Sequence, residues 1–284
     1  MAYGRCHTKW PEKCYDSYTI EPVNNTANEF KAMIKITVCV LTFNSARTLN
    51  DVLPPVLTIA DQVIVLDSGS SDQTLEICRN HGIEAHYSPY EMHGKQMNKA
   101  IALAENDWVF CLDSDEILDT QTLDFIKQLK SASDQPATDQ AWRISRYWYV
   151  LGKQVKTIYP VSSPDYPVRL FNRTVAGFND RPVDDEVVGE KQSSVIPGHV
   201  RHDTFYSLHE MFSKMNSYTT RLIKHQRIRP SLVRGTFSAI GAFFKWYLLN
   251  GSWRLGKVGF ATGVYATLYS FMKYFKAWYQ HNNK

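Results

Sequence analysis

Three aspartates follow apolar runs that resemble buried strands, and their carboxylates could hold a metal and a nucleotide. Asp67 follows Val63–Leu66, and Asp113 and Asp115 follow Trp108–Leu112. Because ligands of open parallel sheets bind outside the carboxyl ends of the strands, we expect these side chains to face one cleft. Carboxylates two residues apart share one side of an extended segment. Such a pair suits a divalent metal that also holds a diphosphate, while Asp67 is placed to accept hydrogen bonds from a base or ribose.

Acidic residues after strands also serve as helix caps and turn formers, so each aspartate has a simpler interpretation. For Asp72 we favour the role of a helix cap or turn former. For Asp67 both interpretations stay open. Asp113 and Asp115 follow five apolar residues and precede Glu116, a concentration of acid that favours metal chemistry over capping.

Strand-like runs alternate with helix-like ones through the first half of the chain, which predicts an α/β fold with a mostly parallel central sheet. Two prolines, Pro54 and Pro55, should kink or break the first helix. We expect Ser70 or Ser71 to cap the second helix and Gly82 to end it. The predicted strands are Ile36–Leu41, Val63–Leu66, Ile83–Tyr87 and Trp108–Leu112, and helices are predicted near Leu49–Leu57, before Gly82, at Gly94–Glu105 and at Thr122–Leu129.

The remainder of the chain changes character twice. Residues 142–200 are rich in Tyr, Arg and Pro, with short strands expected at Trp142–Val150 and Val168–Phe171, and a helix at Leu208–His225. We therefore divide the chain into a polar leader (1–33), a catalytic domain (34–228) and a basic, aromatic helical region (229–284).

Composition agrees with a folded protein of a reducing compartment. Of the 284 residues, 44% are apolar, which is enough for a sizeable core. Cys39, Cys78 and Cys111 lie in apolar runs, and with Cys6 and Cys14 they show no metal-ligand spacing, so buried free thiols are expected. The N-terminal residues lack the apolar core of a secretory signal. These features favour the cytoplasm.

The C-terminal part is strongly basic and aromatic. From Met211 to Lys284 there are twelve Lys or Arg and no Asp or Glu, although the whole chain carries only +4. Its longest uncharged run, Val258–Met272, has fifteen residues, fewer than the roughly 18–20 of a spanning helix. Amphipathic helices at an anionic membrane surface are therefore expected. The alternative is that their apolar faces pack on the catalytic domain. Nucleic acid is disfavoured, since no nucleic-acid motif is present.

Several motifs together resemble the inverting family 2 glycosyltransferases of the GT-A fold, a Rossmann-like nucleotide-diphospho-sugar transferase fold. The matching segments are VLTFNSARTL (40–49), VIVLDSGSSDQT (63–74), GKQMNKAIALAENDWVFCLDSDE (94–116) and VRLFNR (168–173). The resemblance covers about 36–225, and within the family it is strongest to bacterial lipopolysaccharide core β-1,4-glucosyltransferases. It implies transfer of a sugar, glucose first, from a UDP-sugar to a lipid-linked oligosaccharide, the inner-core heptose of lipopolysaccharide or lipooligosaccharide.

The resemblance also assigns residues of the donor site. It implies nucleotide contacts for Thr42, Asn44, Asp67, Lys95 and Asn98. Helix capping is the simpler interpretation of Thr42 and Asn44, and a solvated helix face that of Lys95.

The resemblance places Asp113 near the ribose or sugar and Asp115 on a divalent metal, Mg²⁺ or Mn²⁺. Arg169 could pair with a phosphate or form a structural ion pair. His202 could approach the diphosphate or the metal, or be a core histidine.

The family supplies its general base from a later acidic segment, here Asp184, Asp185 and Glu186 in RPVDDEVVG (181–189). Close relatives often show His-Glu at this point, and this chain shows Asp-Asp. We favour Asp185 and leave the other two open, with a charged surface turn as the simpler alternative.

Other functions stay open. The first alternatives are another cell-envelope polysaccharide glycosyltransferase and a non-catalytic membrane-associated protein that binds sugar nucleotides. A nucleotidyltransferase lacks its Gly-rich, Lys-containing loop here, and a dinucleotide oxidoreductase its G-x-G-x-x-G. UDP-galactose or a UDP-N-acetylhexosamine could replace UDP-glucose. The expected location is the cytoplasmic face of the bacterial inner membrane.

Overall fold

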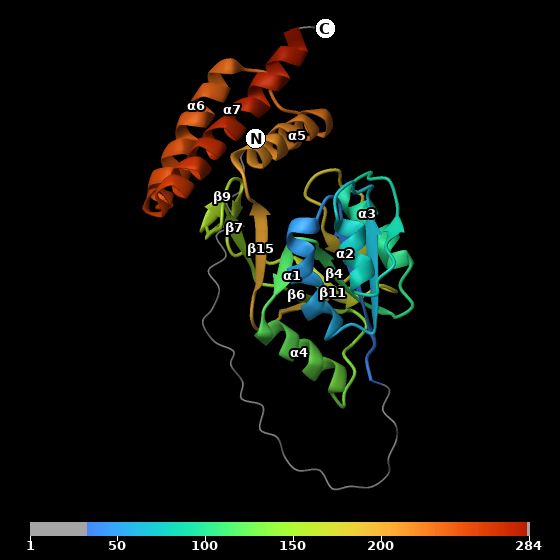
Figure 1. Ribbon diagram of the computed structural model, residues 1–284. Helices are drawn as coiled ribbons and strands as arrows, with labels where there is room; N and C mark the ends of the chain where they lie inside the picture. The colour runs from blue at the N-terminus through green and yellow to red at the C-terminus, as the bar shows by residue number, and fades with distance from the viewer. Residues whose placement is uncertain (1–32, 283–284) are drawn as a thin grey trace, which may run out of the picture. The chain divides into compact units, whose positions relative to one another are not determined.

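The computed structural model describes residues 33–282 (Figure 1). It centres on a seven-stranded sheet with the order β14-β6-β11-β4-β1-β2-β3. β1 pairs in parallel with both β2 and β4, and β2 with β3; only β11 pairs antiparallel with its neighbours. The mostly parallel sheet predicted from the sequence is therefore confirmed. Its strands are β1 (Ile36–Thr42), β2 (Gln62–Asp67), β3 (His86–Tyr87), β4 (Trp108–Asp113), β6 (Gln140–Arg143), β11 (Val168–Asn172) and β14 (Gln192–Val195).

Helices cover both faces of this sheet, which explains why its central strands are mainly apolar. One face, with Val38 and Phe110, packs against α1 (Ala46–Leu57), α2 (Thr74–Asn80) and α4 (Thr120–Ser131). The other face, with Cys39 and Cys111, packs against α3 (His93–Ala102). Cys39, Cys78 and Cys111 are buried free thiols, as predicted. The leader before residue 33, with Cys6 and Cys14, lies outside the described residues.

A second, four-stranded sheet with the order β5-β15-β7-β8 extends from the first. It carries α5 (Leu208–His225), whose predicted bounds are confirmed. Its strands are β5 (Glu116–Leu118), β7 (Arg146–Val150), β8 (Lys153–Gln154) and β15 (Val200–Phe205); two small ladders pair β9 (Thr157–Ile158) with β10 (Val161–Ser162) and β12 (Gly177–Phe178) with β13 (Val187–Val188). The predicted strand Trp142–Val150 is thus two strands in different sheets.

Two local predictions are wrong. The first helix runs through Pro54 and Pro55 without a break, because both lie near its exposed C-terminal end while Val52, Leu53 and Val56 bury its other side. The carbonyls that lose a partner there can bond to water.

The second helix is not capped by Ser70 or Ser71. It begins at Thr74, and Asp72 accepts hydrogen bonds from the Thr74 amide (3.0 Å) and hydroxyl. The carboxylate of Asp72 also accepts from the Ala46 amide at 3.1 Å. Asp72 is therefore a turn former, as favoured from the sequence.

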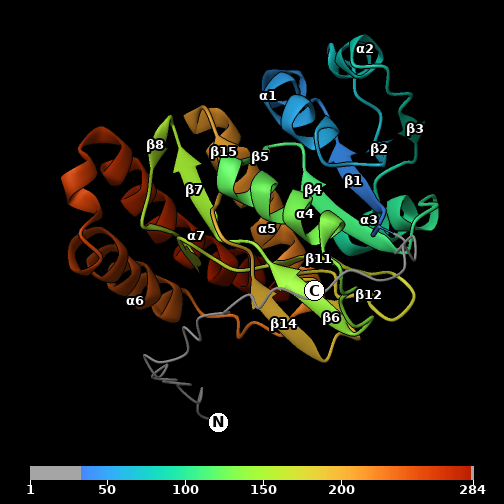
Figure 2. The ribbon, with the colours of Figure 1, turned by 90° about the horizontal axis from the view of Figure 1, so that it is seen from below.

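The C-terminal region is helical, as predicted. It comprises α6 (Leu232–Ala242), a π-helical turn at Phe243–Leu249, a 3₁₀ turn at Ser252–Leu255 and α7 (Lys257–Asn282). In both views α6 and α7 lie side by side (Figure 1 and Figure 2), and α7 also contacts α5. Among residues 33–282, no helix combines the length and apolarity needed to cross a membrane.

Candidate active site

The ends of β1, β2 and β4 place the predicted aspartates at one edge of the central sheet. Thr42 pairs with Asp67 on one side of β1, and Leu41 pairs with Asp113 on the other. Since neighbouring strands lie about 4.8 Å apart, the Cα atoms of Asp67 and Asp113 are separated by about 10 Å. The structure therefore brings these strand ends together, as expected from the parallel topology.

Asp67 is almost fully buried, and its carboxylate is occupied by its own turn. It accepts hydrogen bonds from the Thr42 hydroxyl (2.8 Å), the Ser70 hydroxyl (2.5 Å) and the amides of Gly69 and Ser70 (both 2.8 Å). Asn44, with φ 51°, accepts from the Ser71 amide at 2.8 Å. Asp67 thus stabilises the turn that follows it, and its contact to a base or ribose stays a prediction.

A cavity of about 300 Å³, here named the Asp115 cavity, opens above these strand ends. Oδ1 of Asp115 lies 3.3 Å from Nε2 of His202. Burial would raise the pKa of Asp115, but the charges of His202 and Lys214 outweigh this effect and lower the pKa. The cavity is lined by Leu41–Ser45, Arg47, Thr48, Ser68, Tyr90, His93, Gln96, Asp113–Asp115, Glu210 and Lys214.

Cationic side chains hold both carboxylate oxygens of Asp113. Its Oδ1 lies 2.9 Å from His93 Nε2, and its Oδ2 accepts from Arg169 at 2.8 Å. Burial would raise the pKa of Asp113, but the charges of Arg169 and His93 hold it well below its usual range. Arg169 is therefore part of a structural ion pair with Asp113 and with buried Glu116, the simpler of its two interpretations. Metal binding by Asp113 stays a prediction and requires the exchange of one of these contacts.

His93, which the sequence analysis missed, connects Asp113 to the later acidic segment. Its Nδ1 lies 2.8 Å from Oδ2 of Asp185. Burial would lower the pKa of His93, but the charges of Asp113 and Asp185 and the hydrogen bonds to them raise it to about 10. At neutral pH the imidazolium therefore donates to both carboxylates. The only sequence signal was its position just before the matching segment that begins at Gly94.

A second cavity, of about 600 Å³ and here named the Asp185 cavity, contains the predicted base segment. Asp184 has φ 58°, and burial together with the neighbouring Asp185 and Glu186 raises its pKa. Glu186 pairs at 3.1 Å with Arg181, and both side chains are exposed. The cavity is lined by His93, Asp113, Arg143, Arg146, Trp148, Val161, Asp165–Arg169, Phe178, Asp184–Val187, Glu190 and Tyr218.

Four predicted residues line neither cavity: Asp67, whose contacts are given above, and Lys95, Asn98 and His202. Lys95 lies on the exposed side of α3, 4.0 Å from Glu91. Asn98 binds the Phe178 backbone, donating to its carbonyl at 2.8 Å and accepting from its amide at 3.0 Å. His202 is buried against Trp148, with a centroid separation of 4.4 Å, and contacts Asp115. The roles expected for them toward the nucleotide or metal stay predictions.

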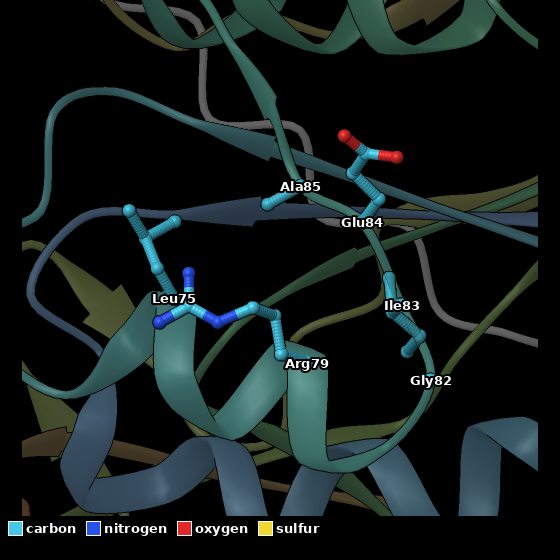
Figure 3. Close-up of a pocket in the computed structure, with 6 residues that line it drawn as sticks. All are labelled: Leu75, Arg79, Gly82, Ile83, Glu84 and Ala85. Atoms are coloured by element: carbon cyan, nitrogen blue, oxygen red, sulfur yellow. The ribbon is translucent and has the colours of Figure 1, made fainter.

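Another cavity, of about 450 Å³, lies between α2 and the segment that leads into β3 (Figure 3). The side chain of Arg79 extends toward Leu75, while the side chain of Glu84 points away from Arg79 (Figure 3). Its lining includes none of the predicted site residues, and we assign it no role.

The chain is similar to known glycosyltransferases. Residues 37–159 match the family described as Glycosyl transferase family 2. The chain is 25% identical over 235 residues to the lipopolysaccharide core biosynthesis glycosyltransferase LpsC of Rhizobium meliloti, which covers 78% of this chain and 83% of that protein. It is also 25% identical to an uncharacterized glycosyltransferase of Rickettsia bellii, over 84% of each.

Solved structures are more distantly similar. Staphylococcus aureus TarS in complex with UDP-GlcNAc has a TM-score of 0.40 and 17% identity, over 88% of this chain and 92% of that one. Glucosyl-3-phosphoglycerate synthase of Mycobacterium tuberculosis, with Mn²⁺, UDP and phosphoglyceric acid, has a TM-score of 0.33 and 23% identity, over 42% and 44% of the two chains.

The mostly parallel sheet with acidic strand ends, together with the family match, defines a glycosyltransferase with the GT-A fold. Residues 37–159 of the chain form a region similar to Glycosyl transferase family 2.

Proposed function

We propose that this protein is an inverting glycosyltransferase that moves a sugar, glucose as first choice, from a UDP-sugar to a lipid-linked saccharide. The relative from Rhizobium meliloti, named for lipopolysaccharide core biosynthesis, supports a lipopolysaccharide core acceptor, for which inner-core heptose is our first choice. Another cell-envelope polysaccharide is the second candidate acceptor.

One observation carries the proposal: the Asp115 cavity and the Asp185 cavity meet at His93 and Asp113, which line both. Transfer of a group between two substrates needs two adjoining sites that bring the reacting atoms into contact. The Asp115 cavity would take the nucleotide sugar, and the larger Asp185 cavity the acceptor saccharide.

The residues beside Asp115 fit a divalent metal that also binds a diphosphate. No group of three His, Cys, Asp or Glu side chains in the described part of the chain surrounds a single metal position. However, Asp115 and His202 offer a carboxylate and an imidazole 3.3 Å apart, and Mg²⁺ or Mn²⁺ commonly takes its other ligands from phosphates and water. Such an ion would neutralise the charge that develops on the leaving diphosphate. Lys214 adds a second positive charge to the same cavity.

Asp185 is the best placed of the three candidate bases. It is half-buried beside the cavity wall and held by His93, whereas Glu186 is paired with Arg181 in solvent. The acceptor hydroxyl oxygen forms a bond to the anomeric carbon as its proton passes to Asp185. The bond from that carbon to the diphosphate breaks, and UDP leaves on the opposite face. A single displacement of this kind inverts the anomeric centre.

The direct test of the proposal is a donor and acceptor screen with the full chain. We expect UDP release from UDP-glucose to depend on Mn²⁺ or Mg²⁺ and to rise on addition of extracted lipopolysaccharide core. UDP-galactose and UDP-N-acetylglucosamine serve as comparison donors. Release that is the same with and without any saccharide acceptor, or after chelation of the metal, would contradict the proposal.

An exposed apolar stripe on α6 and the following π-helical turn supports contact with a membrane. The stripe is formed by Val233, Phe237, Ile240, Phe244 and Leu248, with Phe237 71% exposed. The spacing of three or four residues puts these side chains on one helical face.

The opposite face of α6 is taken by α7. A Cβ at Gly235 would lie 3.2 Å from Tyr274 and 3.3 Å from Phe271. Within residues 33–282, the apolar face of α7 packs on the catalytic part, as Tyr265 does on Phe205, and the α6 stripe does not. Packing on the catalytic part therefore accounts for the apolar face of α7. The α6 stripe stays exposed and can contact a membrane. Arg234 and Lys245 stand exposed beside the stripe, a combination that favours anionic lipid.

We expect replacement of two stripe aromatics, Phe237→Ser with Phe244→Ser, to weaken binding to vesicles that contain phosphatidylglycerol by at least about 10-fold. Insertion of each ring contributes about 1.5–3 kcal/mol. Flotation with liposomes is the measurement, and Tyr87→Ser, at an equally exposed aromatic on β3, is the control. Unchanged binding by the double variant would remove α6 as the membrane surface. The location of the enzyme on the cytoplasmic face of the inner membrane depends on this result.

A further inference from the structure

The first residues of α3 hold the segment that carries the proposed base. This segment, Gly177–Gly189, is here named the base loop. His93 contacts Asp185 at 2.8 Å, and Asn98 binds both the amide and the carbonyl of Phe178. The His93 ring also meets Phe178 edge-on, with centroids 6.0 Å apart. One helix thus holds the base loop at two places.

Gly94 allows α3 to approach the base loop this closely. A Cβ at Gly94 would lie 2.8 Å from the Asn179 carbonyl oxygen and 3.2 Å from Cβ of Asp185. The first distance is shorter than real contacts of a Cβ, and the atom met is backbone, so the loop would have to move. The position of Asp185 therefore depends on a glycine next to His93.

The second nitrogen of His93 ties the base loop to the donor side. Nε2 contacts Asp113 at 2.9 Å, so the ring stands between the end of β4 and the base. With a carboxylate partner on each nitrogen, the orientation of the imidazole is fixed. Asp113 keeps a separate partner in Arg169, at 2.8 Å. Among residues 33–282, the Asp185 carboxylate has no hydrogen bond or ion pair other than that with His93.

We propose that His93 is a positioning residue for the general base: it binds Oδ2 of Asp185 and leaves Oδ1 to receive the acceptor proton. The inference rests on the proposed role of Asp185. Because the ring stands in the wall between the two cavities, it sets the distance from the base to the anomeric carbon of the donor. Loss of the ring frees Asp185 to rotate away but leaves the nucleotide side supported by Arg169.

The expected result for His93→Phe is a fall in kcat of about 10- to 100-fold, the usual cost of losing an orienting partner. The KM for UDP-glucose and the Kd for UDP should change by less than about 3-fold, because Asp113 keeps its arginine. His93→Gln, which retains one donor, should recover part of the loss. His86→Phe, on the exposed strand β3, is the matched control. Equal losses in kcat and in UDP affinity would overturn the proposal.

A double-mutant cycle separates this inference from the function on which it rests. If His93 acts through Asp185, His93→Phe should cost less than about 3-fold in an Asp185→Asn background. A full additional loss in that background would overturn the positioning role and leave Asp185 as the base. Near-normal turnover by Asp185→Asn alone would instead refute the base assignment and the positioning role with it.

Gly94→Ala tests the same geometry without removal of a polar group. We expect kcat to fall at least about 10-fold as the base loop moves, with UDP affinity and the melting temperature nearly unchanged. Gly177→Ala is the control on the same loop, since its added Cβ would meet Asn98 Oδ1 at an ordinary 3.5 Å. Wild-type kcat in Gly94→Ala would contradict the close fit between α3 and the base.

Discussion

Asp115→Ala should reduce sugar transfer by about 1,000-fold or more while the protein stays folded. Loss of this carboxylate removes one of the two groups that fit the metal, and with it the stabilisation of the departing diphosphate. An effect of this size corresponds to about 4 kcal/mol of transition-state free energy. Because the side chain borders the Asp115 cavity rather than the core, its removal leaves the packing of β4 intact. The measurement is kcat with UDP-glucose across a Mn²⁺ titration.

Asp107→Ala, at the opposite end of β4, is the matched control. Its side chain is 62% exposed and lies 3.9 Å from Arg173, so we expect turnover close to wild type. Thermal unfolding of both variants checks the fold. If Asp115→Ala were folded and turned over like Asp107→Ala, neither the metal assignment nor the division of roles between the two cavities could stand.

The architecture followed from local patterns because those patterns record burial. Runs such as Val38–Leu41 are apolar at every position, since helices cover both faces of the strand. Once the strands are parallel, their carboxyl ends share one edge, which is why Asp67 and Asp113 could be placed together from the sequence. The prediction at Pro54 and Pro55 was wrong because it considered only the tendency of proline to break a helix. Burial of the opposite face of α1 stabilises the helix despite the two prolines.

The site was harder to predict because its key contacts join residues far apart in the chain. His93 contacts Asp113 and Asp185, which are 20 and 92 positions away, and a single histidine in a polar segment gives no sign of this. Asp67 shows the converse. Its strand-end position suggested a ligand contact, but the following turn supplies enough donors to occupy its carboxylate. Strand patterns thus locate an active edge, whereas the partner of each side chain there depends on loops that only tertiary structure brings together.

Asp185→Asn should lower kcat by about 100- to 10,000-fold, the range expected for loss of a general base, or about 3–5 kcal/mol. The amide keeps the size of the side chain and can still contact His93, but it cannot accept the acceptor proton. Since Asp185 lines the Asp185 cavity and not the Asp115 cavity proposed for the donor, the KM for the UDP-sugar should change little. Initial rates with saturating donor and varied acceptor measure both effects.

Three further amide variants of the same loop test whether Asp185 is the base. Asp184→Asn and Glu186→Gln test the other two carboxylates, and Asp180→Asn, at an exposed position, is the control. We expect smaller losses for Asp184 and Glu186 than for Asp185, because neither is held by His93 and Glu186 is paired with Arg181 in solvent. If Asp184→Asn were the variant that lost turnover, the proton acceptor would be Asp184, which has a raised pKa and a left-handed backbone. His93 would then orient a neighbour of the base instead.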